Sequence, residues 1–280
     1  MVSKAAVVQM NSCASIGMNL IAAKKLITQA AKLGAKLVVL PECFSILGDK
    51  SVYYLSREIL GEGRVQTYIS NLARELRIWI VAGSIPIVCD KSPSKVYNAS
   101  ILYNSLGEFV TSYYKIHLFD VDIPGGESYR ESDYFYPGDQ TIVTDTPFGR
   151  LGMSICYDIR FPELYRNMLD QGAEIITLPS MFTSTTGAAH WEHLIKARAI
   201  ENQCYLLAAG QSGYHNDTGK LSFGHSMIID PWGKTLGCCE IGEGVVVAEI
   251  NLEKQADLRQ KFPSITNRRF ELKYSLKKPK

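Results

Sequence analysis

The sequence has no long apolar run, no metal-type cysteine pair and little excess charge, and each absence excludes a class of protein. No apolar stretch approaches the length of about 20 residues that a membrane-spanning helix needs. The formal net charge is only +2, so nothing favours nucleic acid or an anionic membrane as a partner. The seven cysteines include no Cys-x-x-Cys pair, so neither a zinc ribbon nor a redox motif is expected.

The cysteines and the N-terminal sequence indicate a reducing compartment. Seven is an odd number, and the adjacent Cys238 and Cys239 are too close for an easy mutual disulfide. The chain runs directly into the apolar segment Ala5–Met10 without a stretch that resembles a secretion leader. We therefore expect a cytoplasmic protein whose partners include neither nucleic acid nor a membrane.

The length and composition are those of one large globular domain. The chain has 280 residues, of which 46% are hydrophobic and 21% charged, enough for a substantial core. No Pro-, Gly- or Ser-rich linker divides it, so residues 1–280 are expected to form a single domain. The basic run Lys273–Lys280 is interpreted as a solvated C-terminal tail.

The order of predicted elements repeats, so the chain divides into two similar halves. In each half the pattern predicts a strand, a helix, a strand, a helix and a strand. These elements are Ala5–Met10, Ile16–Leu33, Lys36–Leu40, Val65–Glu75 and Ile78–Ala82, then Leu151–Ile155, Pro162–Gln171, Glu174–Leu178, Trp191–Glu201 and Tyr205–Ala209. Each half then closes with a hairpin, whose turns lie at 104–107 and 230–233.

Two such halves imply an α/β protein with two mixed sheets. Sheets that face each other bury their apolar surfaces, and the helices then cover the two outer faces. The expected fold is therefore a four-layer α-β-β-α sandwich.

Three polar residues stand just past the ends of predicted strands. Cys156 follows Leu151–Ile155, and Glu42 and Lys115 follow earlier strands. Because strand ends in open α/β sheets converge on one crevice, we expect a thiol, a carboxylate and an ammonium together. That set is typical of a cysteine hydrolase with a non-histidine base. Turn N–H groups and the helix start at Pro162 favour the Cys156 thiolate and can stabilise an oxyanion.

The motifs around these residues resemble those of the nitrilase superfamily of carbon–nitrogen hydrolases. They are Leu40-Pro41-Glu42, Tyr114-Lys115-Ile116-His117-Leu118, Cys156-Tyr157-Asp158-Ile159-Arg160-Phe161-Pro162-Glu163, His190-Trp191-Glu192, Ala197-Arg198-Ala199-Ile200-Glu201-Asn202-Gln203, Gly224-His225-Ser226 and Asp230-Pro231-Trp232-Gly233. The resemblance spans essentially the whole chain and points to the Nit branch. It implies the same α-β-β-α sandwich, an amidase that needs no cofactor or metal, and a homodimer or a higher homo-oligomer.

The resemblance also implies a role for each of the three residues. Cys156 is the nucleophile that forms a thioester, and Glu42 is the general base that takes its proton. Lys115 stabilises the tetrahedral intermediate, and the backbone N–H of Tyr157 is an additional oxyanion donor.

A second active-site glutamate is expected in the segment Phe119–Asp139, which fits neither half and has no periodicity. So long a loop in a compact domain is usually functional, and we expect it to wall the active site. Members of the superfamily place a glutamate near its middle, and we assign that position to Glu131, with Glu127 as the alternative.

Substrate recognition is assigned to three further residues. A small anionic amide needs a second cation, and Arg160 can grip a carboxylate in a fork. The alternative for Arg160 is an ion pair with Asp158 or Glu163. The resemblance places Phe182 and Thr186 in the pocket lining, although an ordinary loop would have the same sequence.

Several functional hypotheses remain open at this point. The leading one is hydrolysis of a small anionic amide, with deaminated glutathione as the substrate, and the alternative is an ω-amidase for 2-oxoglutaramate or 2-oxosuccinamate. A non-catalytic interaction protein that keeps the fold is a third. A histidine base is a rival to Glu42, and His117 is the best candidate because it lies two residues from Lys115.

Overall fold

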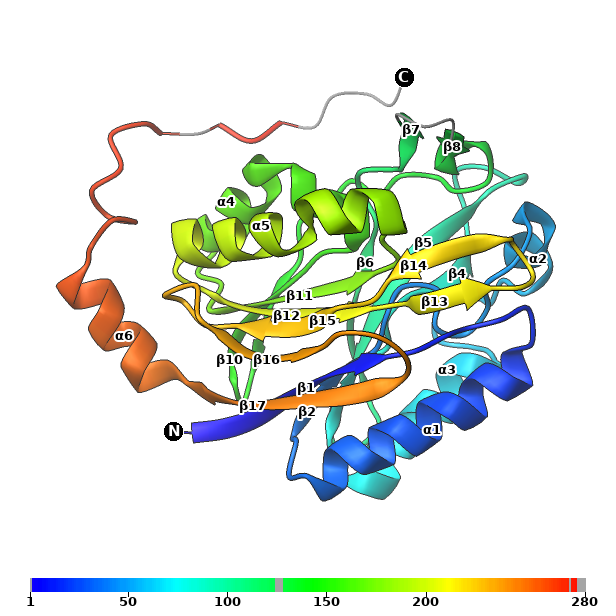
Figure 1. Ribbon diagram of the computed structural model, residues 1–280, viewed down its shortest axis with the longest axis horizontal. Coiled ribbons are helices and arrows are strands. Elements are labelled where there is room, and N and C mark those ends of the chain that lie inside the picture. Colours follow the sequence, from blue (N-terminus) through cyan, green and yellow to red (C-terminus); the bar gives the residue numbers. More distant parts are fainter. Residues whose placement is uncertain (1, 124–127, 272, 276–280) are drawn as a thin grey trace.

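The computed structural model describes residues 2–123, 128–271 and 273–275, and within them two large sheets pack face to face (Figure 1). The first sheet has the strand order β17-β1-β2-β3-β5-β4, with β6 also paired to β5. Its strands are β1 (Val2–Gln9), β2 (Leu37–Val39), β3 (Trp79–Val81), β4 (Ile85–Val88), β5 (Val96–Tyr103), β6 (Phe109–Tyr114) and β17 (Gly244–Asn251).

The second sheet has the order β16-β15-β12-β11-β10-β9. Its strands are β9 (Val143–Thr146), β10 (Gly149–Met153), β11 (Ile175–Ser180), β12 (Tyr205–Gly210), β15 (Ser226–Ile229) and β16 (Thr235–Cys239). The three central strands of each sheet, β1-β2-β3 and β10-β11-β12, run parallel, and the strands outside them are antiparallel. Both sheets are therefore mixed, and the predicted repeat of the two halves is confirmed.

Helices cover the outer face of each sheet, so the predicted four-layer α-β-β-α sandwich is confirmed. Figure 1 shows α1 and α3 below the first sheet and α4 and α5 above the second. The helices are α1 (Ile16–Lys32), α3 (Arg64–Leu76), α4 (Pro162–Asp170) and α5 (Ser184–Asn202).

The central strands are apolar on both faces because each face meets another layer. In β1, Val7 belongs to the core cluster between the sheets, together with Leu151 and Leu207. Its neighbours Ala6 and Val8 belong to the cluster between the first sheet and the helices α1 and α3. Strands buried on both sides have continuous apolar sequences, which explains why these strands stood out in the sequence.

The strand β17 was not predicted, and it joins the two halves. It follows the second half in sequence, but it pairs antiparallel with β1 of the first sheet from Val2↔Asn251 to Gln9↔Gly244. This pairing is a contact between distant parts of the chain, and no local pattern specifies it.

The helix α5 begins earlier than predicted. It starts at Ser184, seven residues before Trp191, although Ser, Thr and Gly are poor helix formers. The hydroxyl of Thr183 accepts a hydrogen bond from the Thr186 N–H and caps this end. A glycine at 187 is required by packing, since a Cβ there would lie 2.2 Å from the Phe223 ring.

The segment Phe119–Asp139 has more regular structure than the sequence suggested. It contains the short hairpin β7 (Asp120–Asp122) and β8 (Ser128–Arg130), followed by a single 3₁₀ turn over Glu131–Asp133. Residues 124–127 lie outside the described part of the chain.

Smaller elements complete the fold. They are α2 (Lys50–Leu55), the hairpin of β13 (Ser212–His215) and β14 (Lys220–Phe223), and α6 (Leu252–Lys261). No helix among the described residues is long and apolar enough to span a bilayer.

After α6 the chain runs back along the layer that contains α4 (Figure 1). Arg268 and Tyr274 both bind the Asp170 carboxylate at the end of α4, and the Tyr274 hydroxyl lies 2.7 Å from it. Residues 273–275 are nevertheless exposed, and the solvated tail from Lys273 stays a prediction, since residues 276–280 lie outside the described part of the chain.

Candidate active site

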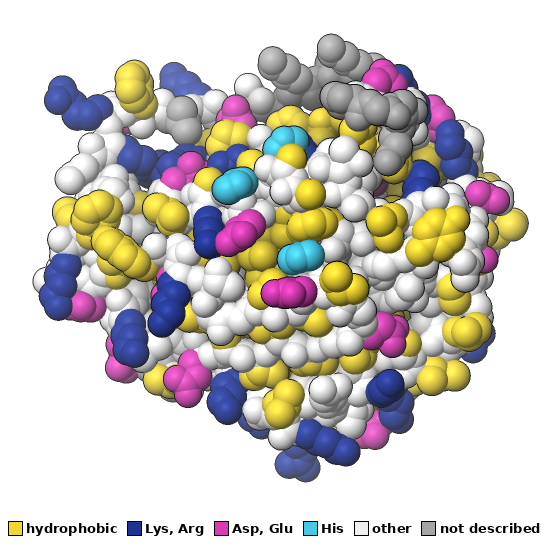
Figure 2. Space-filling view, viewed as in Figure 1, with side chains coloured by type: hydrophobic (Ala, Val, Ile, Leu, Met, Phe, Trp, Pro, Cys, Tyr) yellow, Lys and Arg dark blue, Asp and Glu magenta, His cyan; other side chains and the backbone are white. Residues whose placement is uncertain are grey.

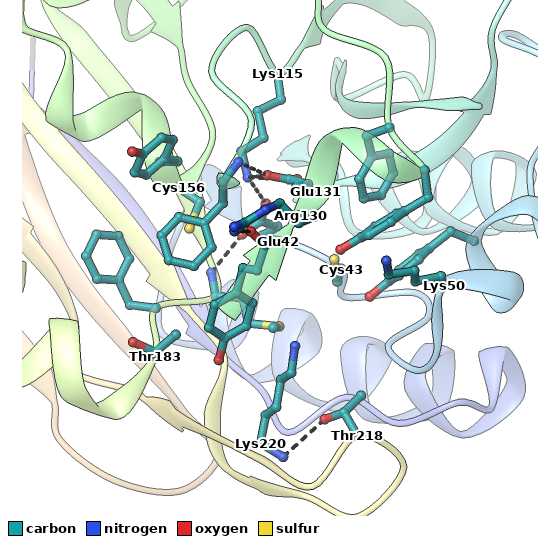
Figure 3. A pocket seen from close by; sticks show the side chains of 18 of the residues that line it. Glu42, Cys43, Lys50, Lys115, Arg130, Glu131, Cys156, Thr183, Thr218 and Lys220 are labelled. Carbon is teal, nitrogen blue, oxygen red and sulfur yellow. Dashed lines mark hydrogen bonds and ion pairs between the residues drawn. The ribbon is translucent and has the colours of Figure 1, made fainter. Parts of the chain in front are cut away.

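A cavity of about 310 Å³ opens at the ends of strands from both sheets (Figure 3). Glu42 follows β2, Lys115 follows β6 and Cys156 follows β10. All three line the cavity, as does Glu131 from the segment after β8. The structure thus brings together the four residues that the sequence analysis singled out as catalytic candidates.

Cys156 occupies a sharp turn between a strand and a helix. Its backbone has the positive φ of 46°, in a region that non-glycine residues rarely adopt, and it begins a 3₁₀ turn that leads into α4 at Pro162. The Asp158 carboxylate accepts a hydrogen bond from the Ile155 N–H at 2.9 Å and secures this turn. The turn presents the side chain of Cys156 to the cavity.

Lys115 lies between two carboxylates. Its Nζ is 2.8 Å from Glu42 Oε1 and 2.8 Å from Glu131 Oε2, and all three side chains are buried. Burial by itself would lower the pKa of Lys115, but the charges of Glu131 and Glu42 hold it well above its ordinary value. Lys115 is therefore a fixed positive charge beside Cys156.

The two oxygens of Glu42 have different partners, which fixes the orientation of its carboxylate. Oε1 accepts hydrogen bonds from Lys115 and from the Asn98 side-chain amide at 2.9 Å. Oε2 accepts one from the backbone N–H of Met181 at 2.9 Å. These three donors hold the carboxylate of Glu42 in one orientation at the wall of the cavity.

The turn N–H groups and the helix start were expected to favour the Cys156 thiolate, but burial outweighs them. Burial, followed by the negative charge of Glu42, raises the pKa of Cys156 well above its ordinary value, and the charge of Lys115 opposes this only in part. The thiol is therefore neutral, and attack by sulfur requires transfer of its proton to a nearby base. The start of the 3₁₀ turn does not outweigh the loss of solvation.

Glu131 is held tightly at the position the resemblance implies. In addition to Lys115, it accepts a hydrogen bond from the Phe119 N–H at 2.6 Å. Burial, together with the charge of Glu42, raises the pKa of Glu131, while Lys115 lowers it. The alternative, Glu127, lies outside the described residues.

His117, the rival base, faces a different partner. Its Nδ1 lies 2.7 Å from the buried Asp158 carboxylate, and its ring stacks on Phe161 at 3.7 Å. Asp158 also accepts a hydrogen bond from the Tyr113 hydroxyl at 2.7 Å. This network ties the end of the Lys115 strand to the Cys156 turn. No histidine is found among the described residues that line the cavity.

The residues assigned to substrate recognition all line the same cavity. Arg160 donates to Nδ1 of His190 at 3.3 Å, and its guanidinium carbon lies 5.4 Å from the centre of the Phe182 ring. Phe182, Thr186 and Tyr157 are further lining residues. In the described part of the chain Arg160 forms no ion pair with Asp158 or Glu163, so that alternative is wrong.

Sequence reasoning missed Asn98, which contacts every member of the buried charge cluster. Its side-chain amide donates to Glu42 and, at 3.3 Å, to Glu131, and its backbone carbonyl accepts from the backbone N–H of Lys115. The available signal was a buried polar residue in the otherwise mostly apolar strand β5. It was not recognised because the partners come from three distant segments.

Comparison with families and relatives gives a consistent result over the whole chain. Residues 4–260 match the carbon–nitrogen hydrolase family model. The deaminated glutathione amidase of Mus musculus is 42% identical over 98% of this chain and 85% of its own. The protein of the same name from Synechocystis is 39% identical over 95% of this chain and 98% of its own.

Solved structures share the fold. The NitFhit protein of Caenorhabditis elegans superposes with a TM-score of 0.87 and 38% identity, covering 96% of this chain and 65% of that one. Nit3 of Saccharomyces cerevisiae, a member of branch 10 of the nitrilase superfamily, gives 0.85 and 33%, covering 96% and 97%.

The position of Asn98 predicts a measurable contribution to stability. Asn98→Leu removes two hydrogen bonds to buried carboxylates, so the free energy of unfolding should fall by about 1.5–3 kcal/mol. Urea denaturation measures this loss. Ser100→Ala is the matched control, because Ser100 is buried two residues along the same strand and its hydroxyl has no hydrogen-bond partner among the described residues. Equal stability of the two variants would contradict the prediction.

Proposed function

The chain belongs to the carbon–nitrogen hydrolase family and is an amidase, and we propose that its substrate is deaminated glutathione. In this proposal Cys156, Glu42, Lys115 and Glu131 carry the reaction through a thioester, without a cofactor. The observation that supports it most directly is the ordered carboxylate of Glu42, held between Lys115, Asn98 and a backbone N–H and close enough to raise the pKa of Cys156.

The proposed reaction has two stages. Glu42 takes the thiol proton as sulfur bonds to the amide carbon, and it then gives that proton to the nitrogen, so that the C–N bond breaks and the amine leaves. A water molecule, deprotonated by Glu42, next attacks the thioester, and the proton returns to the sulfur as the acid leaves. Lys115 and the backbone N–H of Tyr157 stabilise the oxyanion in both stages. Glu131 keeps Lys115 charged and oriented.

The substrate assignment has two sources of support. Relatives about 40% identical over nearly the full chain have the name deaminated glutathione amidase. In the cavity, Arg160 can bind the carboxylate of the 2-oxo acid part, beside the ring of Phe182 and the hydroxyl of Thr186. The second candidate is an ω-amidase for 2-oxoglutaramate or 2-oxosuccinamate, whose acyl parts are similar. The two candidates are distinguished by comparing, under equal conditions, the release of cysteinylglycine from deaminated glutathione with the release of ammonia from 2-oxoglutaramate.

We also propose a single domain that works in the cytoplasm without nucleic acid or membrane partners. All seven cysteines are free thiols in the structure, which suits a reducing compartment. The continuous core between the sheets uses residues from both halves, which supports one folding unit.

A homodimer is proposed through the face that contains α5. By sequence, the apolar positions Leu164, Met168 and Leu169 of α4 fit either a dimer face or core packing, and in the structure they are buried in the core of the protomer. Figure 2 shows hydrophobic side chains gathered near the middle of the face that bears α5, next to histidine and acidic side chains. Ile200 on α5 and Trp232 in the turn before β16 are exposed hydrophobic side chains, and we include them in the proposed interface.

The roles proposed for Cys156 and Glu42 predict distinct losses of amidase activity when each residue is replaced. Cys156→Ala should abolish release of cysteinylglycine from deaminated glutathione, and Glu42→Gln should lower kcat/KM by about 10²–10⁴ because the proton acceptor is gone. Mass spectrometry of acid-quenched enzyme should detect an acyl adduct with the wild type and none with Cys156→Ala. Cys89→Ala, at a buried cysteine outside the cavity, is the control. Substantial turnover by Cys156→Ala would end the thioester mechanism.

Recognition of a carboxylate by Arg160 predicts a loss that depends on substrate charge. Arg160→Lys should reduce kcat/KM for 2-oxoglutaramate about tenfold, since an ammonium cannot reproduce the bidentate fork. For pentanamide, a neutral amide of similar length, kcat/KM should fall much less. Equal fold-losses for the two substrates would remove Arg160 from the binding site.

The proposed interface predicts the mass in solution. Light scattering at micromolar concentration should give at least twice the protomer mass of 31.2 kDa. Ile200→Glu should shift the population toward monomer, because it buries a charge in the interface. Ile21→Glu, at an exposed site on α1 in the opposite outer layer, should not. A wild type that is only monomeric would refute the dimer.

A further inference from the structure

Two of the catalytic candidates are each followed, two residues later, by one member of a hydrogen-bonded pair. His117 follows Lys115 and Asp158 follows Cys156, and Nδ1 of His117 lies 2.7 Å from the Asp158 carboxylate. We propose that His117 is a positioning residue, which holds the Cys156 turn in its reactive geometry through Asp158. The inference rests on the proposed function, because it gives a residue outside the cavity a role in the thioester reaction.

The carboxylate of Asp158 is filled with donors from two segments of the chain. Oδ1 accepts from the backbone N–H of His117 at 3.0 Å and from its Nδ1. Oδ2 accepts from the Tyr113 hydroxyl at 2.7 Å and from the Ile155 N–H at 2.9 Å. A carboxylate has about four acceptor sites, so both oxygens are satisfied. Because Asp158 is fully buried, the loss of one donor leaves an unmet demand that water cannot supply.

The donors from the first segment flank Lys115. Tyr113 lies two residues before it and His117 two residues after it, and both bind the same carboxylate. The Tyr113 hydroxyl also accepts a hydrogen bond from the backbone N–H of Ile116 at 3.3 Å. The segment that bears the positive charge is thereby fastened to the turn that bears the sulfur. Figure 3 shows the side chains of Lys115 and Cys156 directed into the cavity.

The Cys156 turn needs this support because its backbone is strained. The φ of Cys156 is 46°, which a residue with a side chain keeps only where the surrounding contacts enforce it. The side chain of Asp158 bridges Cys156, because it binds the N–H of Ile155 on the other side. The N–H of Tyr157, the proposed oxyanion donor, lies within the same bridge. A small shift of the turn would therefore misplace the nucleophile and the oxyanion donor together.

The network acts from behind the cavity wall. None of His117, Asp158 and Tyr113 is among the described residues that line the cavity, so a contact with the substrate is not their role. In the pair, Nδ1 of His117 is the donor, because a carboxylate oxygen accepts. The His117 ring also stacks on Phe161, with 3.7 Å between the ring centres. The hydrogen bond and the ring packing can be separated by substitution.

Two substitutions of His117 make this separation. His117→Asn keeps a donor near the position of Nδ1 and loses the ring, whereas His117→Phe keeps the ring and loses the donor. The assay uses whichever of deaminated glutathione and 2-oxoglutaramate the wild type hydrolyses faster. His117→Phe should lower kcat about tenfold to a hundredfold, because the reacting groups are misplaced. Its KM should change less than about threefold, because no contact with the substrate is lost. His117→Asn should retain most of the wild-type kcat.

Tyr113→Phe tests the network from the other oxygen of Asp158. It removes only a hydroxyl group, and it should lower kcat several-fold with little change in KM. When Tyr113→Phe is combined with His117→Phe, the loss of kcat should be smaller than the product of the two single losses, because both residues act through Asp158. A loss equal to that product would mean that the two residues act independently, which contradicts the proposal.

Tyr205→Phe is the matched control. The Tyr205 hydroxyl is also in a buried residue, and it hydrogen-bonds the backbone of Asn251 at 3.1 and 3.3 Å, outside the cavity. This variant should lower the thermal stability, as Tyr113→Phe does, and leave kcat unchanged. Equal losses of kcat in the two tyrosine variants would show a general loosening of the fold and overturn the proposal.

The outcomes separate this inference from the proposed function. If His117→Phe keeps the wild-type kcat, or if His117→Asn loses as much as His117→Phe, the positioning role is wrong while the thioester mechanism stands. If His117→Phe does not fold, Tyr113→Phe and its control decide the question. If Cys156→Ala still hydrolyses the amide, the proposed function is wrong and the inference falls with it.

Discussion

The buried ammonium of Lys115 is the interaction on which the rest of the site depends. It lies between the buried carboxylates of Glu42 and Glu131, and its positive charge offsets their mutual repulsion. Its removal would leave an uncompensated pair of negative charges beside a neutral thiol. Its hydrogen bond of 2.8 Å to Glu42 also fixes the orientation of the carboxylate that is proposed to accept the thiol proton.

The fold places this cluster where two sheets meet. Glu42, Lys115 and Cys156 each lie at a strand end, and the network of Asp158 with His117 and Tyr113 ties two of those ends together. The strands behind them are buried on both faces, so the ends have little freedom to move. Precision at the site is thus a consequence of packing over the whole core rather than of any one loop.

The sequence was sufficient to identify catalytic candidates where the residue lies next to a predicted strand or helix. Strand ends located Glu42, Lys115 and Cys156, and the resemblance to a family selected Glu131 within its loop. Asn98 and β17 were missed, because their partners lie far away in the sequence and no local pattern specifies them. The helix start that favours the Cys156 thiolate is visible in the sequence, whereas the desolvation that outweighs it is known only from the packed structure.

The neutral thiol has a consequence for the durability of the protein. Peroxides and electrophiles attack the thiolate form, and their rates depend on how accessible the sulfur is. Cys156 is only 7% exposed and protonated at rest, so between turnovers it is a poor target for oxidation despite being the reactive residue. In the proposed reaction the thiol loses its proton to Glu42 only as the sulfur bonds to the amide carbon. The burial that makes Cys156 depend on Glu42 therefore also protects it from oxidation.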